Sequence, residues 1–177
     1  ELVKTGVQSI PIIILVGVFT GAVMTLQTSY QLVSSFIPKS TIGAIVAQSL
    51  FIELAAVISS LVLAGRVGAR IATELGTMRV SEQIDALESM GFNSVSFLVV
   101  PRVLAGILMF PIVYIAAALF GVLGGVTAGH ISGSLTITEF MNGAREYFFP
   151  SDLIFGMIKS FVFGFVITSI ASFKGYF

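Results

Sequence analysis

The chain lacks several residue types that carry chemistry: among its 177 residues it has no cysteine and no tryptophan, and only one histidine. The absence of cysteine excludes disulfides and thiolate catalysis. His130 has no second histidine or carboxylate close to it in the sequence, which argues against zinc, because zinc sites take three or four protein ligands. The formal net charge is zero and no basic stripe exists, so nothing indicates a nucleic-acid partner.

Motifs for catalysis and for nucleotide binding are also missing. The sequence contains no GxSxG, no HExxH and no Walker A glycine loop. We therefore expect a protein that is not an enzyme and needs no cofactor, so any ATP that powers it is hydrolysed by another polypeptide.

Charge is scarce and apolar residues dominate. Only 10% of the residues are charged, against roughly 25% in a soluble domain, while 56% are hydrophobic and the mean hydropathy is +1.04. Several apolar runs approach the about 20 residues that cross a bilayer as a helix. Runs such as IPIIILVGVF lack the alternation of a membrane β-barrel strand. The composition predicts an all-α integral membrane protein.

Four apolar runs predict a bundle of four transmembrane helices in a single domain over residues 1–177, with spans at about 10–29, 41–65, 101–129 and 152–173. Glycines recur four apart, as in Gly17 with Gly21 and Gly121 with Gly125, which suits close helix packing in lipid. Glycine is also common in membrane helices generally, so each pair has a second explanation.

Basic residues predict the orientation. The connection between the second and third spans holds Arg66, Arg70 and Arg79, with Arg102 at the edge of the next span and Lys174 after the fourth. The other two connections carry one basic residue each. Because Lys and Arg concentrate in cytoplasmic loops, we place the arginine-rich connection in the cytoplasm. The opposite connection contains TITEFMNGAREYFF, which suits a short interfacial helix.

The stretch ELGTMRVSEQIDALESMG, Glu74–Gly91, holds four of the nine acidic residues. Its spacing predicts a helix over 80–90 with one apolar and one acidic face, formed by Val80, Ile84 and Leu87 and by Glu82, Asp85 and Glu88. Gly91 suits a C-cap, and Arg79 is expected to pair with Glu82. An acidic helix fits a basic protein partner better than an anionic leaflet. An ordinary solvated helix packed on its own bundle is the alternative.

The segment GRVGARIATELGTMRVSEQIDALESMG, residues 65–91, resembles the signature of the MlaE/YrbE permease family, the membrane subunits of Mla- and Mce-type ABC lipid transporters. IELAAVISSLVLAG, GVFTGAVMTLQ and IKSFVFGFVITSIASFKGY resemble other helices of the family, so the likeness covers essentially the whole chain. Family members usually have an interfacial helix before the first span and a fifth span after the position of Tyr176. They also often have Arg before the glutamate that matches Glu53 and Gly-Pro after it, where this chain has Ile52, Ala55 and Ala56.

The resemblance implies a dimer that binds cytoplasmic ABC ATPase subunits, with residues 74–91 as the coupling helix. It also implies a periplasmic MCE-domain lipid-binding protein, a small cytoplasmic STAS-type subunit, phospholipid as substrate, and a place in the bacterial inner membrane with a role in outer-membrane lipid asymmetry. The residues that the resemblance assigns to the ATPase contact are Glu74, Arg79, Glu82, Ile84, Asp85, Leu87, Glu88 and Met90.

Glu53 is the sharpest single candidate, since an ionisable group at mid-membrane costs about 2.5–3.5 kcal/mol or more and normally faces a cavity or a partner. By the resemblance it lines a lipid cavity together with Met24, Leu26, Gln27, Tyr30 and Phe51. A buried structural acid is the alternative for Glu53, and interfacial anchoring is the alternative for Tyr30. Lys159 either pairs with Glu53 or extends to the membrane interface.

Three functions fit the sequence. The first is a permease subunit that moves phospholipids between the inner membrane and an MCE-domain carrier, driven by a separate ATPase. The second is a proton- or ion-coupled secondary transporter that titrates Glu53. The third is an assembly scaffold whose acidic helix recruits a cytoplasmic protein without transport.

Overall fold

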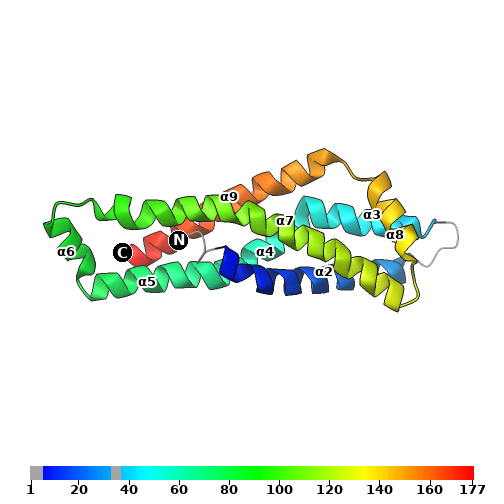
Figure 1. Cartoon of the computed structure of the whole chain (residues 1–177), viewed down its shortest axis with the longest axis horizontal. Helices are drawn as coiled ribbons and strands as arrows, with labels where there is room; N and C mark the ends of the chain where they lie inside the picture. The colour runs from blue at the N-terminus through cyan, green and yellow to red at the C-terminus, as the bar shows by residue number, and fades with distance from the viewer. Residues whose placement is uncertain (1–5, 33–36) are drawn as a thin grey trace.

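Four long helices run back and forth along one axis, and two short helices lie at opposite ends (Figure 1). The computed structural model describes residues 6–32 and 37–177. Within this part, the helices that are long and apolar enough to cross a membrane are Val7–Gln31, Ser40–Val80, Val95–Ile131 and Pro150–Tyr176. They confirm the all-α membrane class and the four predicted spans.

The four helices divide into shorter labelled elements. The first joins η1 (Val7–Ser9) to α2 (Ile10–Gln31). The second is composed of α3 (Ser40–Ser49), η2 (Leu50–Leu54), α4 (Ala55–Leu63), η3 (Ala64–Gly68) and α5 (Ala69–Val80). The third is η4 (Val95–Val99) with α7 (Val100–Ile131), and the fourth is α9 (Pro150–Tyr176). The short helices are α6 (Gln83–Ser89) and α8 (Ile137–Glu146). The predicted short interfacial helix is thus present as α8.

The second and third helices are longer than a bilayer requires. A helix of 41 residues measures about 60 Å at 1.5 Å per residue, whereas the hydrocarbon core is about 30 Å thick. In Figure 1, α5, the beginning of the third helix and the end of α9 extend well past the N-terminus of α2, with α6 at the tip. We call this part of the molecule the α6 end. It carries the arginine-rich connection that the sequence assigns to one side of the membrane.

Three π-helical segments interrupt the α-helical hydrogen-bond pattern: η2, η3 and η4. Each widens one turn and shifts the side chains that follow around the helix, and such segments are frequent at functional sites. Glu53 lies within η2. The regular α-helical spacing of side chains therefore does not apply around Glu53.

Glycines allow α2 and α7 to touch through their backbones. A Cβ added at Gly21 would overlap the carbonyl group of Gly121, and one added at Gly124 would overlap the carbonyl group of Val18. A Cβ at Gly17 would lie 2.9 Å from the Ala117 carbonyl oxygen. Helices in lipid gain little hydrophobic energy on meeting, so such close contact is what holds them together. The packing interpretation of the glycine pairs is confirmed.

Small residues also join α9 to its neighbours. A Cβ at Gly164 would lie 2.9 Å from the Gly106 carbonyl oxygen of α7, and one at Gly175 would lie 2.6 Å from the Ala72 carbonyl oxygen of α5. Buried side chains of α7 pack against the glycines of α9, Tyr114 at Gly156 and Phe110 at Gly164. The end of α9 is therefore fixed against α5 by a backbone contact.

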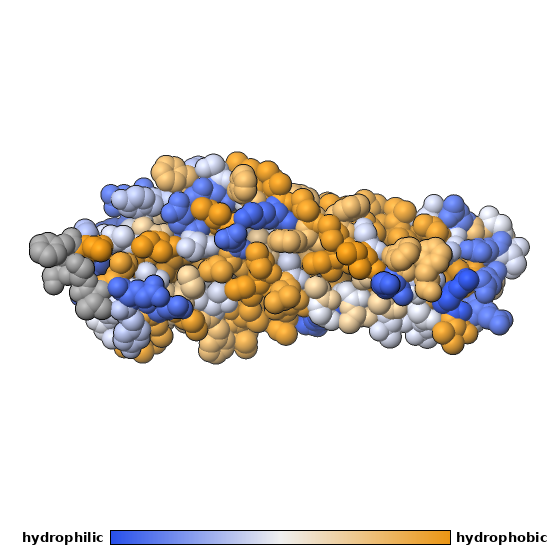
Figure 2. Space-filling model, turned by 180° about the vertical axis from the view of Figure 1, so that it is seen from behind, coloured by the Kyte–Doolittle hydropathy of each residue, from blue (hydrophilic) through white to orange (hydrophobic). Residues whose placement is uncertain are grey.

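Large apolar side chains remain exposed along the middle of the molecule, among them Phe19, Leu119 and Phe165. Figure 2 shows this surface as a broad apolar band, with hydrophilic residues gathered towards the two ends. An apolar belt of this kind on a helical bundle is the surface that lipid covers. Polar groups of the backbone inside the belt are satisfied by the helices themselves.

We predict that Gly21→Ala destabilises the fold by about 1–3 kcal/mol, because the added methyl group has no room against Gly121. Gly65→Ala is the matched control, since a Cβ there meets nothing within 4 Å. Thermal unfolding in detergent, followed by circular dichroism, compares the two variants with the wild type. Equal melting temperatures for both variants would contradict the close crossing of α2 and α7.

Candidate functional site

A pocket of about 400 Å³ opens beside Glu53, at the side of α2 and the second helix. Its walls are formed by Met24, Gln48, Ser49, Ile52, Glu53 and Leu54. The side chain of Glu53 is 68% exposed, so this carboxylate faces open space and is not a buried structural acid. One charged residue and one amide therefore meet apolar walls in a single open pocket.

Lys159 of α9 reaches the same place from the other side of η2. Its Nζ lies 3.7 Å from Glu53 Oε1 and donates a hydrogen bond of 3.1 Å to the Ile52 carbonyl oxygen. The ammonium group also lies 5.6 Å from the centroid of the Phe155 ring. Of the two alternatives that the sequence left open for Lys159, the structure adopts the pairing with Glu53. An acidic and a basic group thus lie together at mid-helix.

The other residues expected around a lipid cavity do not all line this pocket. Met24 lines the pocket. Leu26, Gln27 and Tyr30 lie further along α2, where Leu26 is half-buried, Gln27 is exposed and Tyr30 is 80% exposed. The structure does not bring these three into the wall of the Glu53 pocket.

Phe51 is placed differently from the expectation. Its ring packs edge-on against Phe148, with centroids 5.5 Å apart, and lines a separate pocket of about 220 Å³ beneath α8. Its carbonyl oxygen accepts a 2.6 Å hydrogen bond from the Tyr114 hydroxyl. Residues two apart lie on nearly opposite sides of a helix, so Phe51 lines this pocket and the structure does not bring it into the Glu53 pocket.

Four pocket residues were missed from the sequence: Gln48, Ser49, Ile52 and Leu54. Gln48 gave a usable signal, because it is a second polar residue in the middle of the same apolar run, five positions before Glu53. A spacing of five faces the same side in a π-helical turn, whereas an α-helix repeats every 3.6 residues. The π segment itself has no sequence signature that we can identify.

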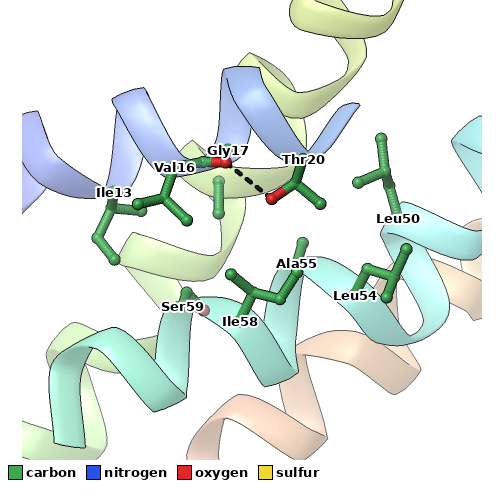
Figure 3. Close-up of a pocket in the computed structure, with 10 residues that line it drawn as sticks. Ile13, Val16, Gly17, Thr20, Leu50, Leu54, Ala55, Ile58 and Ser59 are labelled. Carbon is green, nitrogen blue, oxygen red and sulfur yellow. Dashed lines mark hydrogen bonds between the residues drawn. The ribbon is translucent and has the colours of Figure 1, made fainter. Parts of the chain in front are cut away.

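A second, apolar crevice lies deeper, between α2 and α4 (Figure 3). Side chains of Ile13, Val16 and Thr20 from α2 point towards Ile58 and Ser59 of α4. The free space is about 10 Å³, close to the limit for a single water molecule. This seam is packed, so the candidate ligand site is the open pocket at Glu53.

The structure offers no evident metal site. Among the residues that the structure describes, no group of three His, Asp or Glu side chains gathers to hold an ion. His130 is exposed at the end of α7.

The spacing predicted one helix over 80–90, but the structure has a break within this range. α5 ends at Val80, and Glu82 adopts a left-handed conformation with φ of +58° before α6 begins at Gln83. Ser81 Oγ donates to the Thr77 carbonyl oxygen at 2.7 Å, which is the kind of side-chain bond that competes with helix continuation. The helix therefore breaks at Ser81 and Glu82.

The break changes which residues share a face. Ile84 is fully buried and Leu87 is half-buried, as predicted, but Val80 is 87% exposed and lies outside the apolar face. Arg79 pairs with Asp85 at 2.7 Å rather than with Glu82. Exposed residues here include Arg79, Glu82, Asp85 and Met90, and we call these four the tip surface; Glu88 is exposed as well.

The C-terminal end of α6 is fixed by a Schellman motif. Gly91 has φ of +83°, and its N–H donates to the Glu88 carbonyl oxygen at 2.9 Å. The Phe92 N–H donates to the Leu87 carbonyl oxygen at 3.2 Å, which completes the motif. The predicted C-cap at Gly91 is confirmed.

Glu88 is an exposed residue of α6, and its carboxylate joins two other elements. Its Oε1 accepts hydrogen bonds from Ser94 Oγ at 2.6 Å and from the Tyr176 hydroxyl at 3.0 Å. The Ser94 bond, followed by the Tyr176 bond and the charge of Arg79, holds the pKa of Glu88 below its ordinary value. Hydrogen bonds to a carboxylate favour its charged form.

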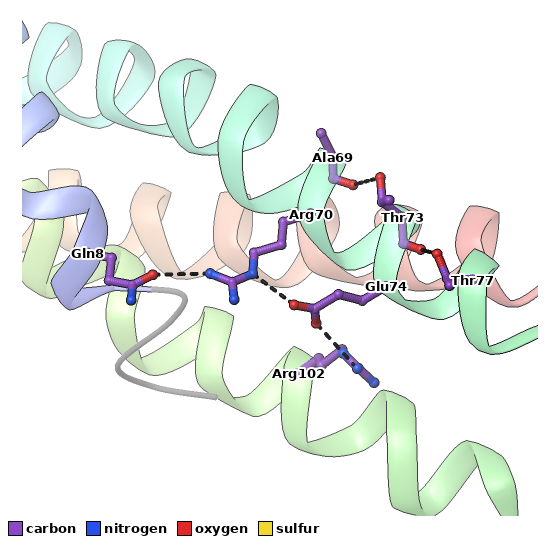
Figure 4. Close-up of polar contacts among 7 residues, drawn as sticks. All are labelled: Gln8, Ala69, Arg70, Thr73, Glu74, Thr77 and Arg102. Carbon is purple, nitrogen blue, oxygen red and sulfur yellow. Dashed lines mark hydrogen bonds and ion pairs between the residues drawn. The ribbon is translucent and has the colours of Figure 1, made fainter. Parts of the chain in front are cut away.

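Glu74 lies three turns before α6 and faces into the bundle, not onto the tip surface. Its carboxylate binds Arg70 Nε at 2.8 Å and Arg102 Nη2 at 3.5 Å, and Arg70 Nη1 donates to Gln8 at 3.1 Å (Figure 4). The Arg102 side chain is buried and also donates to the Leu98 carbonyl oxygen at 2.7 Å. This network ties together the first three helices at the α6 end.

The geometry can be compared with known proteins. A sequence profile described as Permease MlaE matches residues 1–177. The chain belongs to the MlaE permease family. The resemblance found from the sequence is thereby confirmed, and the chain is a multi-pass membrane permease.

Three relatives show the range of the similarity. The first, named "Probable ABC transporter permease protein", is from Rickettsia bellii; it is 39% identical over 177 residues, which are 100% of this chain and 68% of the relative. The second is the intermembrane phospholipid transport system permease protein MlaE of Haemophilus influenzae, 34% identical over 97% of this chain and 66% of the relative. The third is the chloroplastic protein TRIGALACTOSYLDIACYLGLYCEROL 1 of Arabidopsis thaliana, 34% identical over 97% of this chain and 49% of the relative.

The depressed pKa of Glu88 gives a prediction with a definite sign. The Glu88 carboxylate stabilises the fold at neutral pH, and this contribution is lost as the pH falls through its folded-state pKa. Ser94→Ala removes the principal bond and should raise the pKa of Glu88 towards its ordinary value. A carbon-13 NMR titration of the Glu88 carboxyl group measures this. Ser96→Ala, at an exposed position two residues away, is the control; equal pKa values in both variants would contradict the assigned cause.

Proposed function

We propose that the chain is the transmembrane subunit of an ABC transporter that moves phospholipids, driven by a separate cytoplasmic ATPase. The observation that carries this proposal is the open pocket at Glu53 and Lys159, joined by continuous helices to an acidic tip outside the apolar belt. The name of the Haemophilus influenzae relative supports phospholipid as the class of substrate. The chain itself has no catalytic role in this scheme.

The pocket suits a phospholipid by its chemistry. The Lys159 ammonium can bind a phosphate oxygen, and the Glu53 carboxylate can accept from an amine of the headgroup, both as charge-assisted hydrogen bonds. Met24, Ile52 and Leu54 supply apolar surface for the acyl chains. Tyr30 and Gln27 lie further along α2, at the end that would lead the lipid out of the membrane.

The α6 end suits a soluble motor protein. Glu82 and Asp85 present acidic groups beside the apolar side chain of Met90, and a basic groove on an ATPase would accept them. In this scheme the α6 end faces the cytoplasm of a bacterium, the protein resides in the inner membrane, and α8 faces the periplasm. A periplasmic MCE-domain protein would receive or deliver lipid there, and a small STAS-type subunit would join the ATPase.

A second copy of the chain completes the proposed assembly. The Glu53 pocket is open on one side in the single chain, as its 68% exposed carboxylate shows. A lipid headgroup held there needs a second wall to exclude bulk membrane, and a dimer supplies it by placing two such pockets face to face. The similarity to known proteins supports a permease, and the subunit composition is our proposal.

A proton-coupled transporter is the second candidate, and one observation favours it: an exposed carboxylate lies beside a lysine at mid-helix, and intramembrane ionisable groups mark proton and ion pathways. It requires no ATPase and predicts transport driven by a proton gradient. The acidic tip has no role in that mechanism. The ABC family membership supports the first candidate over this one.

Charge reversal at the tip surface tests the motor contact. We predict that Glu82→Lys with Asp85→Lys abolishes recovery of a stoichiometric ATPase when the full-length protein is purified in mild detergent, because like charges would meet across the interface. Glu146→Lys, at an exposed position of α8 at the other end, should leave the recovery unchanged. A wild-type permease that purifies alone, or a double variant that keeps its ATPase, would contradict the motor contact.

Neutralising the pocket carboxylate separates the two transport mechanisms. Glu53→Gln should slow ATP-dependent lipid transfer by about five- to thirtyfold while its dependence on ATP remains, since one charge-assisted contact worth about 1–2 kcal/mol is lost. The assay uses proteoliposomes that hold the complete complex, with and without a proton gradient. Transfer that needs the gradient but not ATP, and that stops in the variant, would favour the proton-coupled mechanism.

A further inference from the structure

One cluster at the α6 end lies outside the Glu53 pocket and joins Glu88, which the resemblance assigns to the ATPase contact, to Ser94 and Tyr176, which it does not. We infer that Tyr176 is a positioning residue that fixes α6 to the end of α9, so that movement of the tip reaches Lys159 through one helix. This inference rests on the proposed ATP-driven function. It assigns a task to a residue that touches neither the pocket nor the tip surface.

Three elements meet at one carboxylate oxygen. Glu88 Oε1 accepts from Ser94 at 2.6 Å and from the Tyr176 hydroxyl at 3.0 Å, and the two hydroxyl oxygens lie 2.7 Å apart. Glu88 belongs to α6, Ser94 immediately precedes η4, and Tyr176 ends α9. The triangle therefore joins α6 to both of the helices that lead back into the membrane.

The two residues that donate in this triangle are buried, while the Glu88 carboxylate that accepts from them is exposed and lines an open pocket with them. Ser94 is 3% exposed and Tyr176 is 9% exposed. A hydrogen bond to a charged group is worth more than a neutral one, and more again where water competes less. The Glu88 tie has two hydroxyl donors from buried residues, whereas both side chains of the Arg79 and Asp85 pair are exposed, so that pair is a weak surface contact.

The end of α9 is packed as well as hydrogen-bonded. The Tyr176 ring belongs to the same apolar cluster as Leu75 of α5 and Ile84 of α6. Beside it, Gly175 brings the backbone of α9 against Ala72 of α5. The ends of α5, α6 and α9 thus form one unit, and among the residues that the structure describes the Tyr176 hydroxyl links α9 to α6 by a hydrogen bond to Glu88.

A single helix connects this unit to the pocket. α9 runs from Pro150 to Tyr176 without a break, and Lys159 lies seventeen residues before Tyr176, or about 25 Å along the axis. Lys159 in turn contacts Glu53 and the Ile52 carbonyl oxygen of the pocket wall. A displacement of α6 that α9 follows as a rigid rod therefore changes the position of the pocket's ammonium group.

Removing only the Tyr176 hydroxyl group breaks this hydrogen bond and leaves the packing of the ring in place. Tyr176→Phe keeps the ring in its apolar cluster, and Ile84 and Leu87 still hold α6 against the bundle. A variant of this kind should fold and still bind the motor through the tip surface. What it loses is the fixed relation between α6 and α9.

The experiment uses the complete complex of the full-length permease with its ATPase, in proteoliposomes of phosphatidylethanolamine and phosphatidylglycerol. ATP hydrolysis and lipid transfer are measured on the same sample, and their ratio is the readout. Tyr176→Phe should lower the lipid moved per ATP at least threefold while complex yield and ATP hydrolysis stay within twofold of wild type. Tyr147→Phe, at an exposed tyrosine that follows α8, is the matched control and should leave the ratio unchanged.

Ser94→Ala gives a second variant that leaves α9 and the Tyr176 ring intact, and it should lower the same ratio by a smaller factor. An unchanged ratio in both variants would overturn the inference, and so would a parallel fall of hydrolysis and transfer, since that is the mark of a merely structural role. A wild-type complex without ATP-dependent lipid transfer would overturn the proposed function itself. The two failures are therefore distinguishable in one set of measurements.

Discussion

Inside a bilayer every backbone N–H and C=O group must find its partner within the protein, and the structure depends on this constraint. The chain can cross only as complete helices, and its second helix continues for 41 residues from the α8 end to the α6 end. Even at η2 and η3 the hydrogen bonds change register without the helix stopping. As a result the pocket at Glu53 and the segment that leads into α6 belong to one uninterrupted element.

The same medium decides how the helices are held together. Because lipid offers no hydrophobic gain for helix association, α2 and α7 meet through glycine at distances that only backbone atoms allow. Charges follow a related rule: Arg102 is buried, but it binds Glu74 and the Leu98 carbonyl oxygen near the α6 end. Lys159 is the one cation near mid-helix among the described residues of α9, and it pairs with Glu53. Polar contacts in this chain therefore mark the places where function is concentrated.

Much of this architecture could be predicted from the sequence, because hydropathy and small-residue spacing report directly on the bilayer and on close packing. The four spans, the burial of Ile84 and the cap at Gly91 follow from periodicity and from the conformational freedom of glycine. The left-handed Glu82 could not be predicted, since the residue itself gives no sign of it and a hydroxyl bond from Ser81 accompanies the break.

The candidate site was harder to predict, for two physical reasons. The π segment at η2 brings Gln48 to the same pocket as Glu53, five positions away, which a period of 3.6 residues does not anticipate. Contacts between distant segments decide where the other side chains lie. The sequence groups Glu74 with the residues of the tip, but in the structure its carboxylate binds Arg70 and Arg102. Likewise, the link from Glu88 to Tyr176 spans 88 positions of sequence. Local pattern carries no information about such pairs.

The most direct test of the central claim is photolabelling of the assembled complex with a phospholipid that carries a photoreactive headgroup. If the pocket at Glu53 holds a headgroup and the α6 end controls it, label should concentrate in residues 20–31 and 45–56, and should fall when ATP is trapped in the motor. Mass spectrometry of the peptides gives both the position and the amount. Label spread evenly over the lipid-facing sides of α7 and α9, and unchanged by ATP, would contradict the claim.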